Sequence, residues 1–450
     1  MPLDTPDALP DIIRARLEAL GTAPCLIGFS GGGDSTALLL MAARWARQCD
    51  VLLIPVIIDH ALRPDSAREA EAAASTAARL GLTPQIVRWA GEKPASGIQA
   101  AARTFRLQTF ARIARTIAAK TILLGHTQDD QAETVWMRLQ AGGGPDALAG
   151  MSLQSPFPLW PEGRDLAIVR PMLDISRADL RDELRREGMD WIEDPSNESR
   201  TFTRIRNRQT LGQLSAGGFD IAELCALAAR FRASRRAAAI AAADVFRHSM
   251  TLFSWGGASL DRDVLCAASD RASLKAMDAV RAAVSGDPSS RPDAARRLLD
   301  GLFASESATA GGAALTFFKE RFWLVRDPGA VSGRADRTAT GNSALATGSG
   351  TIWDGRFVFT LPDLDITPLG KTYPVGISGK ILRTVPALAR PGLPLVRQNG
   401  RVCGIPGLSA QADEVTQSLA SALIRRNLFE DRPPAWFDEQ LHAQTAQGSH

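Results

Sequence analysis

Residues 25–40 read CLIGFSGGGDSTALLL, and this stretch decides the fold of the chain. Its apolar beginning is typical of a strand, its glycines of a tight turn and its apolar end of a helix. Glycine lets a backbone approach a ligand closely and adopt positive φ angles. Because the N–H groups in the first turn of a helix lack partners, the stretch predicts an anion-binding loop between a strand and a helix.

Side chains in this loop add to its backbone donors. Ser30 and Ser35 supply hydroxyl groups, and Asp34 supplies a carboxylate that suits a hard cation. The Walker phosphate loop is excluded because no lysine follows the glycines. The dinucleotide fingerprint is excluded because the glycines do not have its spacing. The simpler alternative is an ordinary glycine turn in which a serine and an aspartate cap a helix.

Short apolar segments alternate with helical segments over the first 125 residues or so. Strands are predicted at 24–29, 51–58, 85–89 and 121–124, and helices at 11–20, 34–48, 66–80 and 97–119. The segment 51–58 is almost wholly aliphatic, as in a strand that is buried on both faces of a parallel sheet. The alternation predicts an α/β fold with a doubly wound, mostly parallel, Rossmann-like sheet.

A second polar block follows the strand predicted at 121–124. His126 lies at the carboxyl end of that strand, where open α/β sheets bind ligands. Asp129 and Glu133 are four residues apart and share one helix face, and Asp130 is one position round from Asp129. The helix dipole alone favours acidic residues in a first turn. It does not explain the histidine, so we expect this block to face the glycine loop.

The motif Ser-Gly-Gly-x-Asp-Ser at a strand end resembles the PP-loop of enzymes that cleave ATP between its α and β phosphates. Further blocks are similar to those of tRNA(Ile)-lysidine synthetases, in that family's order: 59–63, 102–106, 125–133, 148–151, 170–171 and 191–197. The resemblance covers roughly the first half of the chain, and the Glu-Asp-Pro-Ser-Asn loop at 193–197 is its most discriminating part. One departure is that Ile205 and Asn207 exchange the places of the family's Asn and Ile in a basic stretch.

The resemblance implies a ligase that joins lysine to C2 of the wobble cytidine of the isoleucine tRNA with a CAU anticodon. ATP first adenylates the C2 oxygen, and the amine of lysine then displaces AMP to give lysidine. The implied cofactors are ATP and Mg²⁺. The implied partners are that tRNA and free lysine, with no membrane and no protein partner.

The resemblance also implies roles for individual residues. The phosphate-binding loop comprises Ser30, Gly31, Gly32, Gly33, Asp34 and Ser35. Asp34 positions Mg²⁺, and the expected catalytic residues are Asp34, His126, Asp129, Asp130, Glu133, Arg103 and Arg106. One of the carboxylates pairs with the lysine ammonium or takes its proton, and Arg103 or Arg106 clamps the α-phosphate. The residues expected to meet the tRNA are Arg204, Arg206, Arg208 and Asn197.

A chain of 450 residues is too long for one ordinary core. We expect a PP-loop ATP-binding catalytic domain at 1–212 and a mainly helical substrate- and tRNA-binding domain at 213–328. A linker at 329–350, a small α+β C-terminal tRNA-binding domain at 351–432 and a tail at 433–450 follow. An edge strand is predicted at 167–170 and a strand pair at 315–326. Arg232, Arg235 and Arg236 lie close together on a predicted helix, where they hold phosphates or form a solvated face.

Composition limits the classes of function. The net charge of +3 is small for this length, so any nucleic-acid surface must be local. The longest apolar stretches are shorter than a membrane span, and the N-terminus lacks the basic and apolar regions of a secretion signal. The five cysteines are scattered and form no C-x-x-C pair. A reducing cytoplasm is therefore the expected setting.

Two other functions remain open from the sequence. One is a PP-loop tRNA thiolase acting on cytidine, although members that carry sulfur or a cluster depend on suitably placed cysteines. The other is a non-catalytic, nucleotide-gated RNA-binding module, which would need the glycine loop without the acidic block. A brown chromophore after anaerobic purification would favour the first, and unaltered ATP after incubation with every tRNA would favour the second.

Overall fold

The computed structural model describes residues 11–193, 203–332, 345–347, 350–361, 363–439 and 441. By their internal contacts the residues divide into two compact units, Met1–Arg235 and Arg236–His450. Each unit has its own sheets and its own buried clusters. The finer division into domains and a linker stays a prediction.

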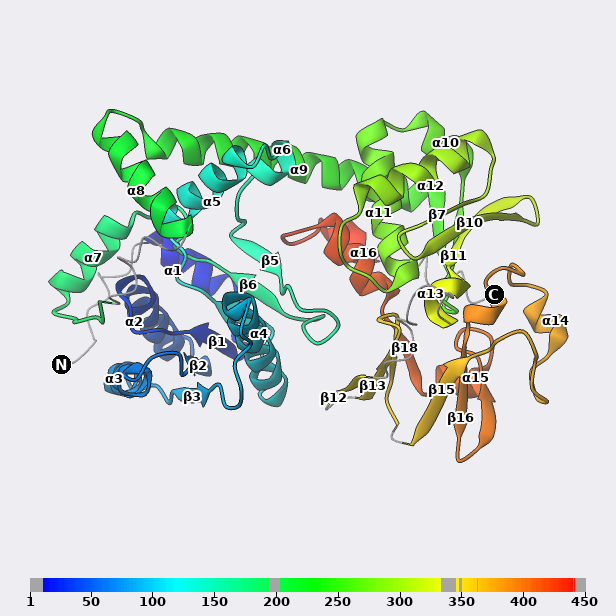
Figure 1. Ribbon diagram of the computed structural model, residues 1–450, viewed down its shortest axis with the longest axis horizontal. Coiled ribbons are helices and arrows are strands. Elements are labelled where there is room, and N and C mark those ends of the chain that lie inside the picture. The colour runs from blue at the N-terminus through cyan, green and yellow to red at the C-terminus, as the bar shows by residue number, and fades with distance from the viewer. Residues whose placement is uncertain are drawn as a thin grey trace. The chain divides into compact units, whose positions relative to one another are not determined.

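The first unit contains a six-stranded sheet with the order β3-β2-β1-β4-β6-β5 (Figure 1). The strands are β1 (Cys25–Gly28), β2 (Leu53–Asp59), β3 (Gln85–Arg88), β4 (Thr121–Leu123), β5 (Gln154–Pro156) and β6 (Ala167–Val169). All neighbouring pairs are parallel except β5 with β6. The doubly wound, mostly parallel sheet is therefore confirmed.

One strand prediction is wrong in its position. β6, predicted as an edge strand, pairs with β4 on one side and with β5 on the other. The edge strand is β5, whose residues Gln154, Ser155 and Pro156 carry no β-branched or aromatic side chain. The sequence gives no strand signal there, because both composition and the proline argue against a strand.

The helices of the first unit cover both faces of this sheet. They are α1 (Asp11–Glu18), α2 (Gly33–Gln48), α3 (Ser66–Arg79), α4 (Ile98–Thr116), α5 (Gln128–Gln140), α6 (Pro145–Leu148), α7 (Arg177–Arg186) and α8 (Thr203–Ala216). Successive strand residues point to opposite faces. Cys25 and Ile27 thus join a core with α1, α2, α3 and α7, whereas Leu26 joins a second core with α4.

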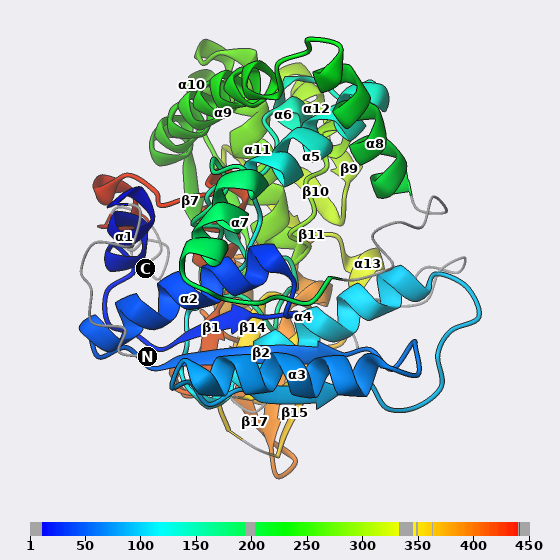
Figure 2. The same cartoon turned by 90° about the vertical axis from the view of Figure 1, so that its left-hand side faces the viewer.

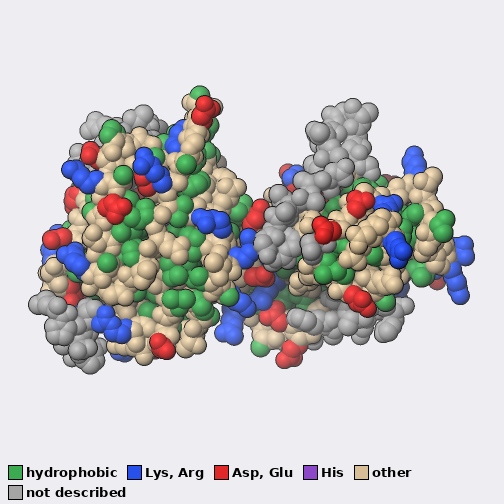
Figure 3. Space-filling view, turned by 90° about the horizontal axis from the view of Figure 1, so that it is seen from below, with side chains coloured by type: hydrophobic (Ala, Val, Ile, Leu, Met, Phe, Trp, Pro, Cys, Tyr) green, Lys and Arg blue, Asp and Glu red, His purple; other side chains and the backbone are tan. Residues whose placement is uncertain are grey.

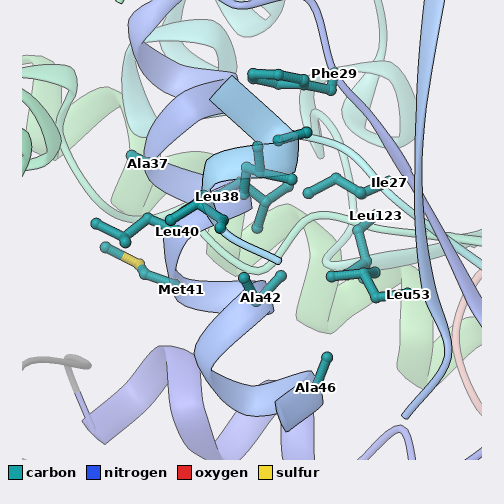
Figure 4. Packing of buried hydrophobic residues seen from close by; sticks show 14 of the residues in the cluster. Ile27, Phe29, Ala37, Leu38, Leu40, Met41, Ala42, Ala46, Leu53 and Leu123 are labelled. Carbon is teal, nitrogen blue, oxygen red and sulfur yellow. The ribbon is translucent and has the colours of Figure 1, made fainter. Parts of the chain in front are cut away.

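The helix α2, which follows the glycine loop, is anchored in the core along most of its length. Figure 4 shows Leu38 and Ala42 of α2 on the side of the helix that faces strand residues such as Ile27, Leu53 and Leu123. Residues Thr36–Ala46 of α2 are all buried. The helix therefore fixes the loop before it against the end of β1.

The strand order places a topological switch point between β1 and β4. From β1 the chain moves outward to β2 and then β3, whereas β4 lies on the other side of β1. Helices that follow strands on either side of such a point diverge, and they leave a crevice at the carboxyl ends of the strands. The glycine loop follows β1 and His126 follows β4, so the sheet brings both to this crevice.

The second unit holds three antiparallel sheets, with the orders β7-β8-β11-β10-β9, β12-β13-β14-β18 and β15-β16-β17. Their strands are β7 (Met250–Leu252), β8 (Ala258–Leu260), β9 (Ala308–Ala310), β10 (Ala313–Phe318), β11 (Arg321–Arg326), β12 (Leu345–Thr347), β13 (Gly350–Trp353), β14 (Phe357–Phe359), β15 (Leu364–Pro368), β16 (Pro394–Gln398), β17 (Arg401–Gly404) and β18 (Thr416–Ser418). β10 and β11 confirm the predicted strand pair. The region predicted as mainly helical thus also contains a five-stranded sheet.

The remaining helices include α9 (Ile221–Ser249), which continues past Arg235, the last residue of the first unit. The others are α10 (Arg262–Ala267), α11 (Asp270–Ser285), α12 (Pro292–Ala304), α13 (Pro328–Ser332), α14 (Gly379–Leu382), α15 (Ala410–Asp413), α16 (Ala420–Leu428) and the 3-10 turn η2 (Arg390–Gly392). In the described part of the chain, every helix is too short or too polar to cross a membrane.

Candidate active site at the switch point

The glycine loop has the shape that the sequence predicts. Gly31 has a φ of +82°, which favours glycine, and a Cβ added there would lie 2.6 Å from Cδ1 of Ile192. The Ile192 N–H donates to the Gly31 carbonyl at 2.8 Å. Only glycine fits at this position, because the segment after α7 packs directly on the turn.

The two loop serines brace the turn from within. The Ser35 hydroxyl donates to the Gly32 carbonyl at 2.9 Å and accepts from the Ser30 N–H at 3.3 Å. The two hydroxyl oxygens lie 3.1 Å apart. Gly32 is the N-cap of α2 and makes no side-chain cap, so the first-turn N–H groups remain directed at the crevice.

The turn after β4 rests on the turn after β1. A Cβ added to Gly125 would lie 3.0 Å from the Asp34 carbonyl oxygen and 3.2 Å from the Ser35 Cα. Glycine at this position therefore lets the two backbones touch. His126 follows directly, half-buried, so the structure brings the histidine and the glycine loop to one crevice, as expected.

Arg177, at the start of α7, joins the two acidic groups. Its Nε donates to Asp34 Oδ2 at 2.9 Å, and its Nη2 lies 3.4 Å from Asp130 Oδ1. Its backbone N–H donates to Asp129 Oδ2 at 2.8 Å, and its Nη1 lies 3.9 Å from Asp129 Oδ1. One guanidinium thus lies among three carboxylates. Two of them, Asp129 and Asp130, follow the third, Asp34, by about 95 residues in the sequence.

Burial and charge oppose each other at this cluster. Burial raises the pKa of the Asp34 carboxyl above its ordinary value, although Arg177 and Arg181 pull that pKa down. Burial works to lower the pKa of Arg177, but Asp34, Asp130 and Asp129 outweigh it and raise that pKa. The site therefore holds a carboxylate in an environment that disfavours its charge, which is common where a group must bind a cation or a substrate.

The three carboxylates of α5 have different surroundings. Asp130 belongs to the capping box of the helix, since its Oδ2 accepts from the Thr127 N–H at 2.9 Å. Only its other oxygen faces Arg177. The Asp129 side chain is 37% exposed, whereas Glu133 is buried. Asp129 is thus the open carboxylate of the block, and Asp130 both caps the helix and faces the site.

The two arginines expected on the α-phosphate lie on α4 in different settings. Arg106 is half-buried and close enough to His60, which follows β2, to act on it: burial first, then Arg106, lowers the pKa of His60. Arg103 is exposed, and no contact between described residues joins it to Asp34. The structure therefore places Arg106 at the carboxyl edge of the sheet and leaves Arg103 on the helix surface.

The residues expected to meet tRNA are only partly described. Asn197 lies outside the described residues. Arg204, Arg206 and Arg208 belong to α8, whose backbone alone is described at those three positions. α8 packs against α5, so this arginine-bearing helix is joined to the helix that carries the acidic block.

The arginines of α9 have structural partners. Arg232 donates to the Ala149 carbonyl at 3.0 Å, and Arg235 donates to the Asp146 carbonyl at 3.1 Å. Arg236 forms an ion pair with Asp431. These contacts give the three arginines a bracing role, which is neither the phosphate binding nor the solvated face that the sequence leaves open.

Sequence reasoning missed Arg177, the first residue of the helix α7, which Ser176 caps. The Ser176 hydroxyl accepts from the Asp179 N–H at 3.1 Å, as expected of an N-cap. The sequence predicts a strand at 167–170 before this residue, but only the structure shows that this strand, β6, lies next to β4. A cation at the first position of α7 lies at the same sheet edge as His126.

The donor set at this crevice suits Mg²⁺ held together with phosphates. No group of three metal-ligating side chains occurs among the described residues, so a cage built wholly from protein is not present there. Mg²⁺ is usually bound by one or two carboxylates together with substrate phosphates. Asp34 fits that pattern because its carboxylate stands beside a predicted phosphate loop.

The fold and this site define a PP-loop protein. The family described as PP-loop domain matches residues 11–215, which include both the glycine loop and α7. A solved structure of the U34-tRNA thiolase NcsA from Methanococcus maripaludis is similar with a TM-score of 0.41 and 15% identity, covering 49% of this chain and 77% of that chain.

Relatives narrow the class to one family. A tRNA(Ile)-lysidine synthase from Methylobacterium sp. (strain 4-46) is 38% identical over 343 residues, which cover 73% of this chain and 96% of the relative. Another, from Caulobacter vibrioides, is 39% identical over 202 residues, or 44% of this chain and 48% of the relative. The chain thus spans about half the length of several curated relatives. It belongs to the tRNA(Ile)-lysidine synthase family.

Proposed function

We propose that this protein uses ATP to join lysine to C2 of the wobble cytidine of the isoleucine tRNA with a CAU anticodon. The C2 oxygen attacks the α-phosphorus, and the electron pair of the broken bond leaves with pyrophosphate. The amine of lysine then attacks C2, AMP leaves with the former C2 oxygen, and the nitrogen loses a proton. The products are lysidine, AMP and pyrophosphate.

The observation that carries this proposal is the cluster around Arg177. The Arg177 guanidinium contacts Asp34 of the PP-loop and also Asp129 and Asp130 of α5. An adenylated base and an incoming amine would therefore share one crevice. Such proximity replaces a bimolecular encounter with a positioned one. The names of the relatives support the same reaction.

Each part of the crevice has a chemical task in this reaction. The N–H groups at the start of α2, with Ser30 and Ser35, bind the β-phosphate and stabilise the charge that grows as pyrophosphate leaves. Asp34 holds Mg²⁺, which offsets phosphate charge when bound. Arg106, and Arg103 from the same helix, reach toward the α-phosphate in the proposed complex.

The carboxylates of α5 serve the lysine. A lysine amine attacks only when it is neutral, so a carboxylate that first pairs with the ammonium and then accepts its proton aids the step. Asp129 is the accessible one, and the half-buried His126 lies three residues before it in the chain. We propose that Arg204, Arg206 and Arg208 of α8, together with Asn197, hold the tRNA backbone near this crevice.

Among the cysteines, the surroundings of Cys225 favour the ligase over a thiolase. Cys225 lies near the site, where its thiol donates to the Gln128 carbonyl at 3.6 Å. Burial raises the pKa of the Cys225 thiol to about 11 and that of Cys25 to about 11. Since the thiolate is the reactive and metal-binding form, both positions disfavour sulfur chemistry.

The proposal is tested by incubating the protein with ATP, labelled lysine and the CAU-anticodon isoleucine tRNA. We expect AMP release and label in the tRNA, and neither with Asp34→Ala, whose fold is checked by circular dichroism melting. A wild-type protein that releases no AMP and labels no tRNA would refute the proposal.

A further inference from the structure

A row of arginines runs along one side of α7, beside the PP-loop. Arg177, Arg181 and Arg185 are spaced four residues apart, so they lie on one face of the helix. With Asp129, Ala178 and Asp182 they line a pocket of about 310 Å³. This volume is at the lower end of the range for small-ligand sites and is large enough for a compact anion.

The three arginines of this pocket differ in their partners. Arg177 is engaged by Asp34, Asp129 and Asp130, and Arg185 forms an ion pair with Asp182. Arg181 differs from both, because no carboxylate of a described residue lies within ion-pair distance of it. Its Nε is shielded from solvent and has no hydrogen-bond partner among the described residues. A shielded guanidinium donor without an acceptor is costly unless a ligand supplies one.

The row lies beside the start of α2. α7 packs along α2, as Figure 2 shows, and Arg181 is close enough to Asp34 to lower its pKa. Arg185 lies 6.0 Å from the ring of Trp191, and Trp191 Cδ1 is 3.4 Å from the position of a Cβ on Gly33. Two elements that attract anions, the helix N-terminus and the arginine row, therefore adjoin each other.

We propose that Arg181, with Arg185 beside it, binds the terminal phosphates of ATP and then the pyrophosphate that leaves. This inference rests on the proposed use of ATP. The terminal phosphates carry most of the charge of the triphosphate, and the leaving pyrophosphate gains more as the bond to the α-phosphorus breaks. The planar guanidinium matches two phosphate oxygens at once. Arg181 is then a substrate-binding residue, and Arg177 keeps its place among the carboxylates.

The test is calorimetric titration of the full, ligand-free chain with inorganic pyrophosphate. Losing a charge-assisted hydrogen bond weakens binding roughly tenfold or more, so Arg181→Gln is expected to raise the dissociation constant by at least that factor. Arg181→Lys keeps the charge but lacks the planar guanidinium that can donate to two phosphate oxygens at once, and it is expected to recover part of the affinity. Arg68→Gln removes the same charge from a side chain that is 84% exposed on α3, and it is expected to bind as wild type does.

Melting temperatures of all four proteins establish that the variants are folded. If folded Arg181→Gln binds pyrophosphate as tightly as wild type, or if Arg68→Gln weakens binding equally, the inference is overturned. The proposed function has a separate readout. A wild type that makes lysidine while Arg181→Gln keeps its pyrophosphate affinity overturns this inference alone. A wild type that makes no lysidine but binds pyrophosphate through Arg181 supports this inference and overturns the proposed function.

Discussion

At the residue scale, Asp34 combines burial with an ion pair. Its carboxylate is 24% exposed and pairs with Arg177 at 2.9 Å, yet burial still keeps its pKa above the ordinary value. The pair thus only partly offsets the loss of hydration. Stability alone would favour a neutral side chain at this position, which is consistent with the proposed role of Asp34 in holding Mg²⁺.

This balance predicts opposite effects of Asp34→Asn on stability and on activity. Between the unfolded and the raised folded pKa of Asp34, the folded chain binds more protons than the unfolded chain. The contribution of the Asp34 carboxyl to the free energy of unfolding therefore falls as pH rises through that window, and it stays unfavourable above it. We expect Asp34→Asn to melt no lower than wild type at pH 7 and to lose most of its ATP turnover. A melting temperature well below that of wild type at neutral pH would contradict the argument.

Asn207 gives a second prediction for a single residue. It is 6% exposed in α8, and its amide nitrogen has no hydrogen-bond partner among the described residues. The family to which the basic stretch is similar has isoleucine at this place. Removing a buried unsatisfied group and adding apolar contact should raise the free energy of unfolding by about 1 kcal/mol. Denaturant titration of Asn207→Ile measures this change, and an equal or lower stability would show that Asn207 is satisfied.

At the scale of elements, the site depends on two turns that touch. α2 and the turn after β4 meet where Gly125 lies against the backbone of Asp34 and Ser35. Neither backbone can move easily, because α2 is buried along residues Thr36–Ala46 and Leu124 donates to the Val169 carbonyl at 2.9 Å. The absence of a side chain at Gly125 therefore sets the distance between the PP-loop and the turn that carries His126.

The mutation Gly125→Ala tests this spacing. Its added methyl would lie 3.0 Å from the Asp34 carbonyl oxygen, so the turns must part by a few tenths of an ångström. We expect a loss of about 1–3 kcal/mol in stability and a larger proportional loss in kcat than in ATP affinity. Gly144→Ala is the matched control, because no atom lies within 4 Å of its added Cβ. Equal behaviour of the two variants would contradict the argument.

The elements themselves are largely readable from the sequence, whereas their meeting at Arg177 is not. Strands such as β2 and helices such as α2 are predicted within a few residues, because runs and periods of apolar residues are local signals. Arg177 contacts Asp34 across 143 positions in the chain. No local pattern encodes such a contact, and only the strand order that brings β6 next to β4 creates it. The edge strand β5 was missed for a related reason, since its pairing rather than its composition makes it a strand.

At the scale of the whole molecule, the net charge of +3 is small for a chain of 450 residues. Figure 3 shows Lys and Arg side chains among Asp, Glu and apolar ones on the face in view, in agreement with a net charge of +3. If the chain binds a polyanion as large as tRNA, as proposed, it does so through local basic groups. The arginines of α8 are the proposed ones, and their helix packs against α5 next to the site.

A tRNA-binding measurement at several salt concentrations tests this proposal. Each phosphate contact contributes about 0.7–0.9 to the slope of log affinity against log salt. Replacing Arg204, Arg206 and Arg208 by glutamine should therefore make the slope shallower by about 2 to 3 and weaken binding at low salt. Arg68→Gln should leave the slope unchanged. An unchanged slope in the triple variant would place the tRNA elsewhere.

In the proposed complex, the triphosphate of ATP lies in the glycine loop and faces the histidine and carboxylates across one crevice. A crystal structure of the full chain with Mg²⁺, lysine and an ATP analogue that resists cleavage between the α and β phosphates tests this arrangement most directly. We expect the β-phosphate on the N–H groups of Gly31–Gly33 and the α-phosphorus between Asp34 and His126. A triphosphate bound at any other edge of the sheet would contradict this expectation.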